Sequence, residues 1–140
     1  MFGNRKKAIG GAEKLAGVAF FDGFSPDELQ RVADLAHDVD AEKGAVLVEQ
    51  GRVGQECYVI LDGEASVYVG GEHVTTSGPG SMVGEMALLE HKPRNATVVA
   101  DSPMKLIVFD NRAFKKLLEE MPKVHDRVME TLAARLKPSS

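Results

Sequence analysis

Short apolar runs separated by glycine-containing turns fill the middle of this chain and restrict its fold more than any other feature. Residues 58–61 and 65–69 are β-type runs on either side of Asp62-Gly63, a dipeptide typical of tight hairpin turns. Gly70-Gly71 is a second hairpin signal. Turn signals spaced by about eight to twelve residues are typical of sandwiches and barrels. We therefore expect antiparallel β-structure in the middle of the chain.

The N-terminal part of the chain has helical patterns instead. Apolar residues recur at helical spacing over residues 12–21, which predicts a short helix. Ser25 is a good N-cap for a second helix, Pro26 suits its first position, and Glu28 completes a capping box. The first ten residues are basic and contain glycine, so we expect residues 1–10 to be a flexible leader and residues 11–140 to form a single domain.

Helical spacing returns at the C-terminal end. Asp110 or Asn111 can cap a helix with an i, i+3, i+4 apolar stripe, and Pro122 divides this helix from a last one. The expected order is therefore two helices, about eight short strands and two helices. This order predicts a mainly β fold, an antiparallel jelly-roll-like β-barrel flanked by N-terminal and C-terminal helices.

Charge and composition exclude several classes of protein. The formal net charge of −4 lacks the basic footprint of a general nucleic-acid binder. No apolar stretch reaches the length of about 18 residues that a membrane span requires. The single cysteine, Cys57, rules out an internal disulfide and fits a reducing compartment, so we expect a cytoplasmic location.

A barrel fold leaves a metal-dependent enzyme as one alternative. Such a site needs several histidine or carboxylate ligands that converge inside the barrel. The histidines are scattered singly, and no two of them share a close strand spacing; they are His37, His73, His91 and His125. We therefore expect no metal, no cofactor and no catalytic residues.

Residues 83–98 carry the chemistry of this chain. Gly84 allows another group to approach the backbone closely, and the good helix formers after it predict a short helix with free N–H groups, a natural anion site. Arg94 can hold a phosphate through two parallel hydrogen bonds. Glu85 offers acceptors suited to a sugar hydroxyl. Together these features predict a nucleotide pocket.

The sequence of residues 84–89, followed by that of residues 93–98, resembles the phosphate-binding cassette of the cyclic-nucleotide-binding domain family. This family includes regulatory domains of cyclic-AMP-dependent kinases, nucleotide-gated channels and bacterial catabolite-type regulators. Four further glycines match the family pattern, namely Gly44, Gly51, Gly63 and Gly80. The resemblance extends over residues 21–136. It implies a jelly-roll sensor domain that binds its ligand reversibly and catalyses no reaction.

The resemblance also implies roles for individual residues. Arg94 would pair with the cyclic phosphate, and Glu85 would accept a hydrogen bond from the ribose 2′-hydroxyl with help from the Gly84 backbone. Other implied ligand-binding residues are Met86 in the cassette, Ala87 and Asn95 through their N–H groups, Val67 on the base side, and Val83, which with Val98 supports the cassette. The helices from Asn111 onward would move toward the cassette when ligand binds and signal to an effector protein or domain.

The residue after the arginine departs from the common family patterns. Many members have a small residue there and guanine-preferring members often have threonine, whereas this chain has Asn95. An amide can both donate and accept, so the choice between cyclic AMP and cyclic GMP stays open. Cyclic AMP is expected only because the family as a whole favours it. A ligand-free protein-interaction module on the same fold is the remaining alternative.

Overall fold

The computed structural model describes residues 7–8, 15–84 and 93–136, and it confirms the expected helix after Ser25, the run of central strands and the two C-terminal helices. The N-terminal elements are β1 (Lys7–Ala8), the 3-10 helix η2 (Ala19–Phe21) and α1 (Pro26–Leu35). The central strands are β2 (His37–Ala41), β3 (Val46–Val48), β4 (Glu56–Asp62), β5 (Ala65–Val69), β6 (Glu72–Ser77), β7 (Met82–Val83), β8 (Thr97–Ala100) and β9 (Met104–Asp110). The C-terminal helices are α3 (Asn111–Glu120) and α4 (Pro122–Leu136).

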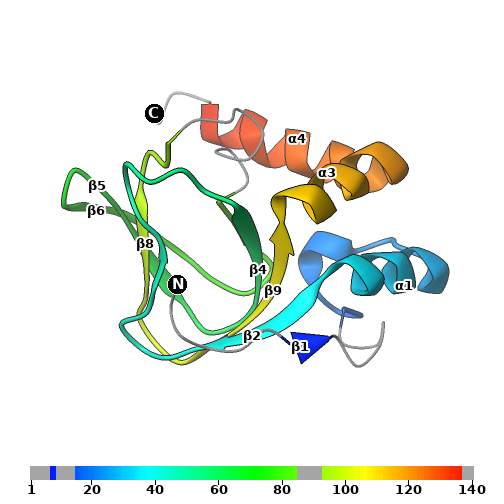
Figure 1. Ribbon diagram of the computed structural model, residues 1–140, viewed down its shortest axis with the longest axis horizontal. Coiled ribbons are helices and arrows are strands. Elements are labelled where there is room, and N and C mark those ends of the chain that lie inside the picture. Colours follow the sequence, from blue (N-terminus) through cyan, green and yellow to red (C-terminus); the bar gives the residue numbers. More distant parts are fainter. Residues whose placement is uncertain (1–6, 9–14, 85–92, 137–140) are drawn as a thin grey trace.

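The strands form two antiparallel sheets that face each other as a jelly-roll-like sandwich. One sheet has the order β1-β2-β9-β4-β7 and the other has the order β3-β8-β5-β6. The helices lie together on one side of the sandwich, next to β4 and β9 (Figure 1). The mainly β architecture with flanking helices is thus confirmed. The expected closure into a barrel is not seen among the described strands, where the two sheets remain separate ladders.

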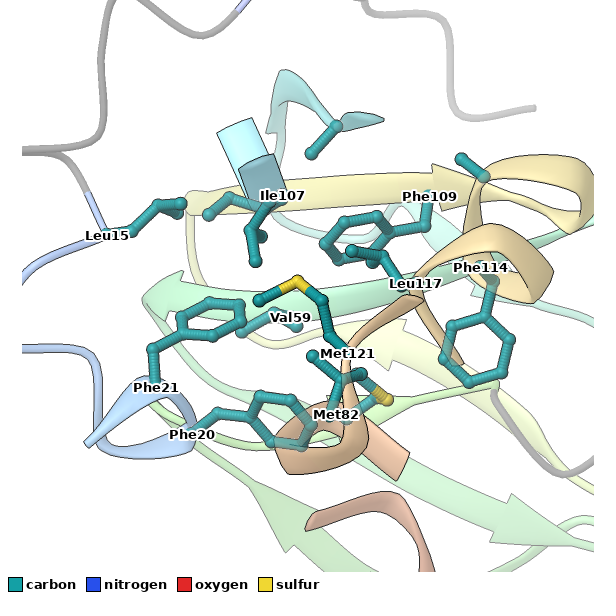
Figure 2. Packing of buried hydrophobic residues seen from close by; sticks show 14 of the residues in the cluster. Leu15, Phe20, Phe21, Val59, Met82, Ile107, Phe109, Phe114, Leu117 and Met121 are labelled. Atoms are coloured by element: carbon teal, nitrogen blue, oxygen red, sulfur yellow. The ribbon is translucent and has the colours of Figure 1, made fainter. Parts of the chain in front are cut away.

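Two hydrophobic cores share the strands β4 and β9. Alternate residues of a strand point to opposite faces of a sheet. One face of these two strands packs against the other sheet, through Tyr58, Ile60, Leu106 and Val108. The opposite face packs against the helices, through Cys57, Val59, Ile107 and Phe109. Figure 2 shows this second core, where Phe20 and Phe21 of η2, Phe114 of α3, Met82 of β7 and Met121 after α3 pack around Val59 and Ile107.

The predicted N-caps of α1 and α3 are confirmed, and so is the start of α4 at Pro122. The Ser25 hydroxyl accepts a hydrogen bond from the Glu28 N–H at 3.2 Å, and the Ser25 N–H donates to the Glu28 carboxylate at 2.8 Å, which completes the capping box. The Asp110 carboxylate caps α3 by accepting from the Ala113 N–H at 2.8 Å. Pro122 begins α4, one residue after the C-cap of α3.

The structure differs from the sequence-based expectation near the N-terminus. The described part of the predicted helix over residues 12–21 is a turn followed by the 3-10 helix η2. Gly17 has a φ of 85°, which lies outside the right-handed helical region and interrupts a helix at this point. Within the expected leader, Lys7 and Ala8 form β1, which pairs with β2.

Two cationic side chains connect the C-terminal helices to α1. Arg31 donates two hydrogen bonds to the two carboxylate oxygens of Glu120, at 2.8 and 2.9 Å. Lys123 on α4 donates to the Glu28 carboxylate at 2.8 Å, and this hydrogen bond lowers the pKa of Glu28. The same ammonium donates to the carbonyl of Gly23 at 2.9 Å. Helices from the two ends of the chain are therefore joined directly.

A third cation, Arg127, joins α4 to the turn that contains η2. Its guanidinium donates to the carbonyls of Phe20 at 3.0 Å and Ala19 at 3.3 Å, and also to the carbonyl of Asp22. It also lies over the ring of Phe24, with 5.9 Å between Cζ and the ring centroid. One arginine of α4 thus donates to three carbonyls of the turn that contains η2, in addition to the hydrogen bond that Ala19 accepts from the N–H of Asp22.

Candidate functional site

The candidate site is built around Arg94, which lies just before β8. Its side chain is buried, with 7% of its surface exposed, and charged side chains are rarely this buried unless they are paired. Nη1 donates to the carbonyl of Gly84, and Nη2 donates to the carbonyl of Glu56 at the start of β4. The guanidinium is therefore held by backbone oxygens from two separate segments of the chain.

Two glycines make room for this guanidinium. Gly84 has a φ of 88°, and a Cβ at this position would lie 2.7 Å from Nη1 of Arg94. A Cβ at Gly54 would overlap with Cζ, Nε and Nη2 of Arg94. The predicted close approach at Gly84 is thus observed. Sequence reasoning missed Gly54, because a glycine in a polar loop has no distinctive signal.

The loop between β3 and β4 also fixes the backbone of Arg94. The N–H of Arg94 donates to the carbonyl of Arg52 at 2.8 Å, and the carbonyl of Arg94 accepts from the N–H of Gly51 at 2.8 Å. A bridge between Val53 and Pro93 continues this antiparallel pairing. The main chain and the side chain of Arg94 are therefore both positioned by the same loop.

A cavity of about 830 Å³ opens beside the guanidinium. Its volume is within the range of about 300–1,000 Å³ that is typical of small-molecule sites. Its walls are β3, the loop after it and the beginning of β4, and its polar lining residues are Glu49, Arg52, Gln55, Glu56, Tyr58, Arg94 and Asp110. The arginine thus borders a space large enough for a mononucleotide.

Tyr58 lines this cavity and is buried. Its hydroxyl donates a hydrogen bond to the Glu56 carboxylate at 3.2 Å. Burial raises the pKa of Tyr58 to about 12, although the nearby charge of Arg94 acts in the opposite direction. The Tyr58 hydroxyl therefore keeps its proton to a higher pH than an ordinary tyrosine and donates its hydrogen bond to the Glu56 carboxylate.

The other described candidate residues, Val83, Val67 and Asn95, lie outside the lining of this cavity. Val83 is buried between the sheets and pairs with Tyr58 across β7 and β4. Val67 is half-buried on β5, where it pairs with the buried Val98 of β8. Asn95 follows Arg94 and is exposed. Neither these valines nor Asn95 are among the residues that line the cavity, which extends toward β3 and the loop before β4.

Three candidate residues, Glu85, Met86 and Ala87, lie outside the described residues. The predicted helix after Gly84 and the predicted contact of Glu85 with a sugar hydroxyl therefore stay predictions. Gly84 is the last described residue before them, and its carbonyl is the one that accepts from Arg94.

The described residues hold neither a metal-binding cluster nor a membrane-spanning helix. Within the described ranges, no group of three or more histidine, cysteine or acidic side chains is arranged to hold a metal ion. In the same part of the chain, no helix is both long enough and apolar enough to cross a membrane. Cys57 is completely buried in the core next to the helices. The expected lack of a catalytic centre stays a prediction.

Comparison with protein families decides the classification. Residues 38–121 match the family model described as the cyclic nucleotide-binding domain. The chain belongs to the cyclic nucleotide-binding domain family. The matched range contains Gly54, Glu56, Gly84 and Arg94, so the buried guanidinium and its surroundings lie inside the family's domain.

Three similar proteins illustrate the range of this family. A cAMP-dependent protein kinase regulatory subunit of Schizosaccharomyces pombe is 40% identical over 90 residues, which are 64% of this chain and 22% of that protein. The structure of a cAMP-binding acyltransferase from Mycobacterium smegmatis, solved as a mutant, is 34% identical with a TM-score of 0.74, over 89% of this chain and 40% of that one. The regulatory subunit of a cAMP-independent protein kinase A from Trypanosoma brucei is 27% identical with a TM-score of 0.76. The match covers 85% of this chain and 44% of that one.

The cyclic nucleotide-binding domain is only part of each of these proteins. This chain spans 22%, 40% and 44% of their lengths. The shared part is the domain itself, and the kinase and acyltransferase names describe the larger proteins that contain it.

Proposed function

We propose that this domain binds a cyclic mononucleotide, with cyclic AMP preferred over cyclic GMP, and that Arg94 pairs with the cyclic phosphate. The observation that carries the proposal is a buried guanidinium, placed between Gly54 and Gly84 at the edge of a cavity of about 830 Å³. Family membership supports this ligand class. The names of the yeast and mycobacterial relatives support cyclic AMP in particular.

The chemistry of the neighbouring residues suits this ligand. The planar fork of Arg94 can hold two phosphate oxygens through parallel, charge-assisted hydrogen bonds. In this proposal Glu85 accepts from the ribose 2′-hydroxyl. Further proposed contacts are the N–H groups of Ala87 and Asn95 to the phosphate, Met86 in the cassette, Val67 beside the base, and Val83 behind the cassette.

We further propose that α3 and α4 move when the ligand binds and that an effector protein or domain reads this movement. A contact next to the arginine supports such coupling. The N–H of Asn111, the first residue of α3, donates to the carbonyl of Gln55 at 2.8 Å. The next residue, Glu56, holds the guanidinium of Arg94. The ligand needs only to bind one arrangement of the helices more tightly than the other, and no bond is made or broken.

A ligand-free interaction module is the second candidate function. One observation favours it: the Trypanosoma brucei protein matches this fold with a TM-score of 0.76 and is described as belonging to a cAMP-independent kinase. The fold can therefore occur in a protein that cyclic AMP does not control. In that case the surface of the domain, rather than its cavity, would carry the function.

Calorimetric titration of the chain with cyclic AMP, cyclic GMP and 5′-AMP tests the proposal. We expect saturable binding of cyclic AMP, weaker binding of cyclic GMP and much weaker binding of 5′-AMP. Arg94→Ala should weaken binding of cyclic AMP by about 2–4 kcal/mol, because a buried charge partner is removed. The matched control is Arg52→Ala, which removes the same charge from the same cavity at a side chain that is 77% exposed.

The outcomes separate the two candidate functions. If the parent chain binds none of the three nucleotides, the interaction module becomes the better description. If Arg94→Ala binds as tightly as the parent while circular dichroism shows an intact fold, the assignment of the phosphate site is wrong. Equal losses in Arg94→Ala and Arg52→Ala would point to a general charge effect and not to a specific grip.

A further inference from the structure

Residues 51–56, which we call the arginine seat, supply the contacts that position Arg94 from one side. The N–H of Arg94 donates to the carbonyl of Arg52, and the carbonyl of Arg94 accepts from Gly51, both at 2.8 Å. Nη2 donates to the carbonyl of Glu56. The main chain of Arg94 is thus anchored at the start of the seat, and the guanidinium is held at its end.

Gly54 lies in the middle of the arginine seat, directly against the guanidinium. A Cβ at this position would approach Cζ, Nε and Nη2 of Arg94 more closely than the 3.0 Å that real Cβ atoms respect. Gly54 does not have the positive φ that requires glycine at most other glycine positions of this chain. Its backbone conformation would therefore accept alanine without strain. The lack of a side chain is needed for the arginine, and not for the turn.

We propose that Gly54 is a positioning residue that sets where the guanidinium of Arg94 lies, and through it the strength of phosphate binding. The readout by ligand affinity rests on the proposed function. With alanine at position 54, the backbone of Arg94 stays anchored by its two hydrogen bonds, so the flexible end of the side chain must move. A displaced guanidinium loses its alignment with the carbonyls of Glu56 and Gly84, and with any anion placed between two of its N–H groups.

A matched pair of glycine variants tests this inference. Gly78 also has no positive φ, and a Cβ at this position would meet no atom within 4 Å. Both Gly54→Ala and Gly78→Ala remove the same backbone freedom from the unfolded chain, so their difference reports the steric effect alone. We expect Gly54→Ala to weaken binding of cyclic AMP about tenfold or more, as for a misaligned hydrogen bond to a charged group, and Gly78→Ala to leave it unchanged.

A double-mutant cycle with Arg94→Lys shows whether Gly54 acts through the guanidinium. Lysine keeps the charge but has no planar fork to align, and its flexible stem lets the ammonium turn away from a Cβ at position 54 without losing a pair of parallel hydrogen bonds. In the Arg94→Lys background, Gly54→Ala should therefore cause little further loss of affinity. An equal loss in both backgrounds would mean that Gly54 acts through the backbone, and it would overturn the proposal.

The same cycle, measured by thermal unfolding without nucleotide, separates this inference from the proposed function. If the parent chain binds no cyclic nucleotide, the proposed function fails, but the melting temperatures still report the contact. We expect Gly54→Ala to lower the melting temperature in the parent and to lower it less in the Arg94→Lys background. Additive shifts would overturn the positioning role, whether or not the chain binds a nucleotide.

Discussion

Replacing Arg127 with methionine tests how firmly α4 is attached to the N-terminal turn. Methionine has nearly the same helix propensity as arginine, so α4 itself should persist. The substitution removes the donors to the carbonyls of Ala19, Phe20 and Asp22. It also removes the cation that lies 5.9 Å from the ring centroid of Phe24. The N-terminal turn then keeps its apolar contacts with the core and the hydrogen bond from Lys123 to the carbonyl of Gly23, but loses the hydrogen bonds from Arg127.

The size of the effect follows from these contacts. A hydrogen bond from a charged donor contributes about 1.5–3 kcal/mol, and a partly exposed cation–π contact about 0.5–1 kcal/mol. Arg127 is only half-buried, so water can replace part of what the carbonyls of the turn lose. The contacts sum to about 5–10 kcal/mol, and because water and the remaining contacts of the turn replace much of this, we expect Arg127→Met to lower the free energy of unfolding by about 2–3 kcal/mol.

Urea unfolding followed by circular dichroism measures this loss. The control is Arg112→Met, which removes the same charge from an exposed position on α3. A surface substitution of this kind should change the free energy of unfolding by no more than about 0.5 kcal/mol. If Arg127→Met behaves like the control, the hydrogen bonds to the turn do not hold α4 in place, and the reasoning is refuted.

Two further predictions concern Tyr58 and Gly63. Because burial raises the pKa of Tyr58 from 10.0 to about 12, the folded state keeps this proton at a pH where the unfolded state loses it. The stabilisation is complete below pH 10 and falls as the pH rises, by about 1.4 kcal/mol at pH 11, and Tyr58→Phe should lack this component in urea titrations from pH 9 to 11. Gly63→Ala should lower stability by about 2–3 kcal/mol, because its φ is 92° and a Cβ would lie 2.5 Å from the carbonyl of Pro103. Gly71→Ala, with a φ of 85° and no atom within 4 Å of a Cβ, should show only the backbone cost of about 1–2 kcal/mol, and equal losses at the two positions would contradict the clash.

Features that depend on a few adjacent residues could be predicted from the sequence. The capping box at Ser25, the cap at Asp110 and the turn after Asp62 each join groups close together in the chain, and all three are present. The prediction of a helix over residues 12–21 was wrong, because Gly17 takes a left-handed conformation that apolar spacing does not reveal. Closure into a barrel was also not predictable, because it depends on which strands meet at the sheet edges.

The geometry of the candidate site was predicted only in part. The sequence pointed to Arg94 and Gly84 through their chemistry and spacing, and the structure brings the two together, while their binding of a phosphate stays a prediction. The contribution of residues 51–56 depends on pairing between segments that are distant in the sequence, and neither Gly54 nor the carbonyl of Glu56 carries a signal of its own. A backbone carbonyl is available at every residue, so only the fold shows which one holds the guanidinium.

Strands β4 and β9 connect the two hydrophobic cores. Each strand contributes to both hydrophobic cores, because its alternate side chains point into the sandwich and into the layer beside the helices. Neither core can open without exposing one face of these two strands, so we expect the sandwich and the layer beside the helices to unfold together. The amide protons of β4 and β9 should therefore be the slowest in the molecule to exchange. A substitution on one face of these strands should also alter the packing on the other face.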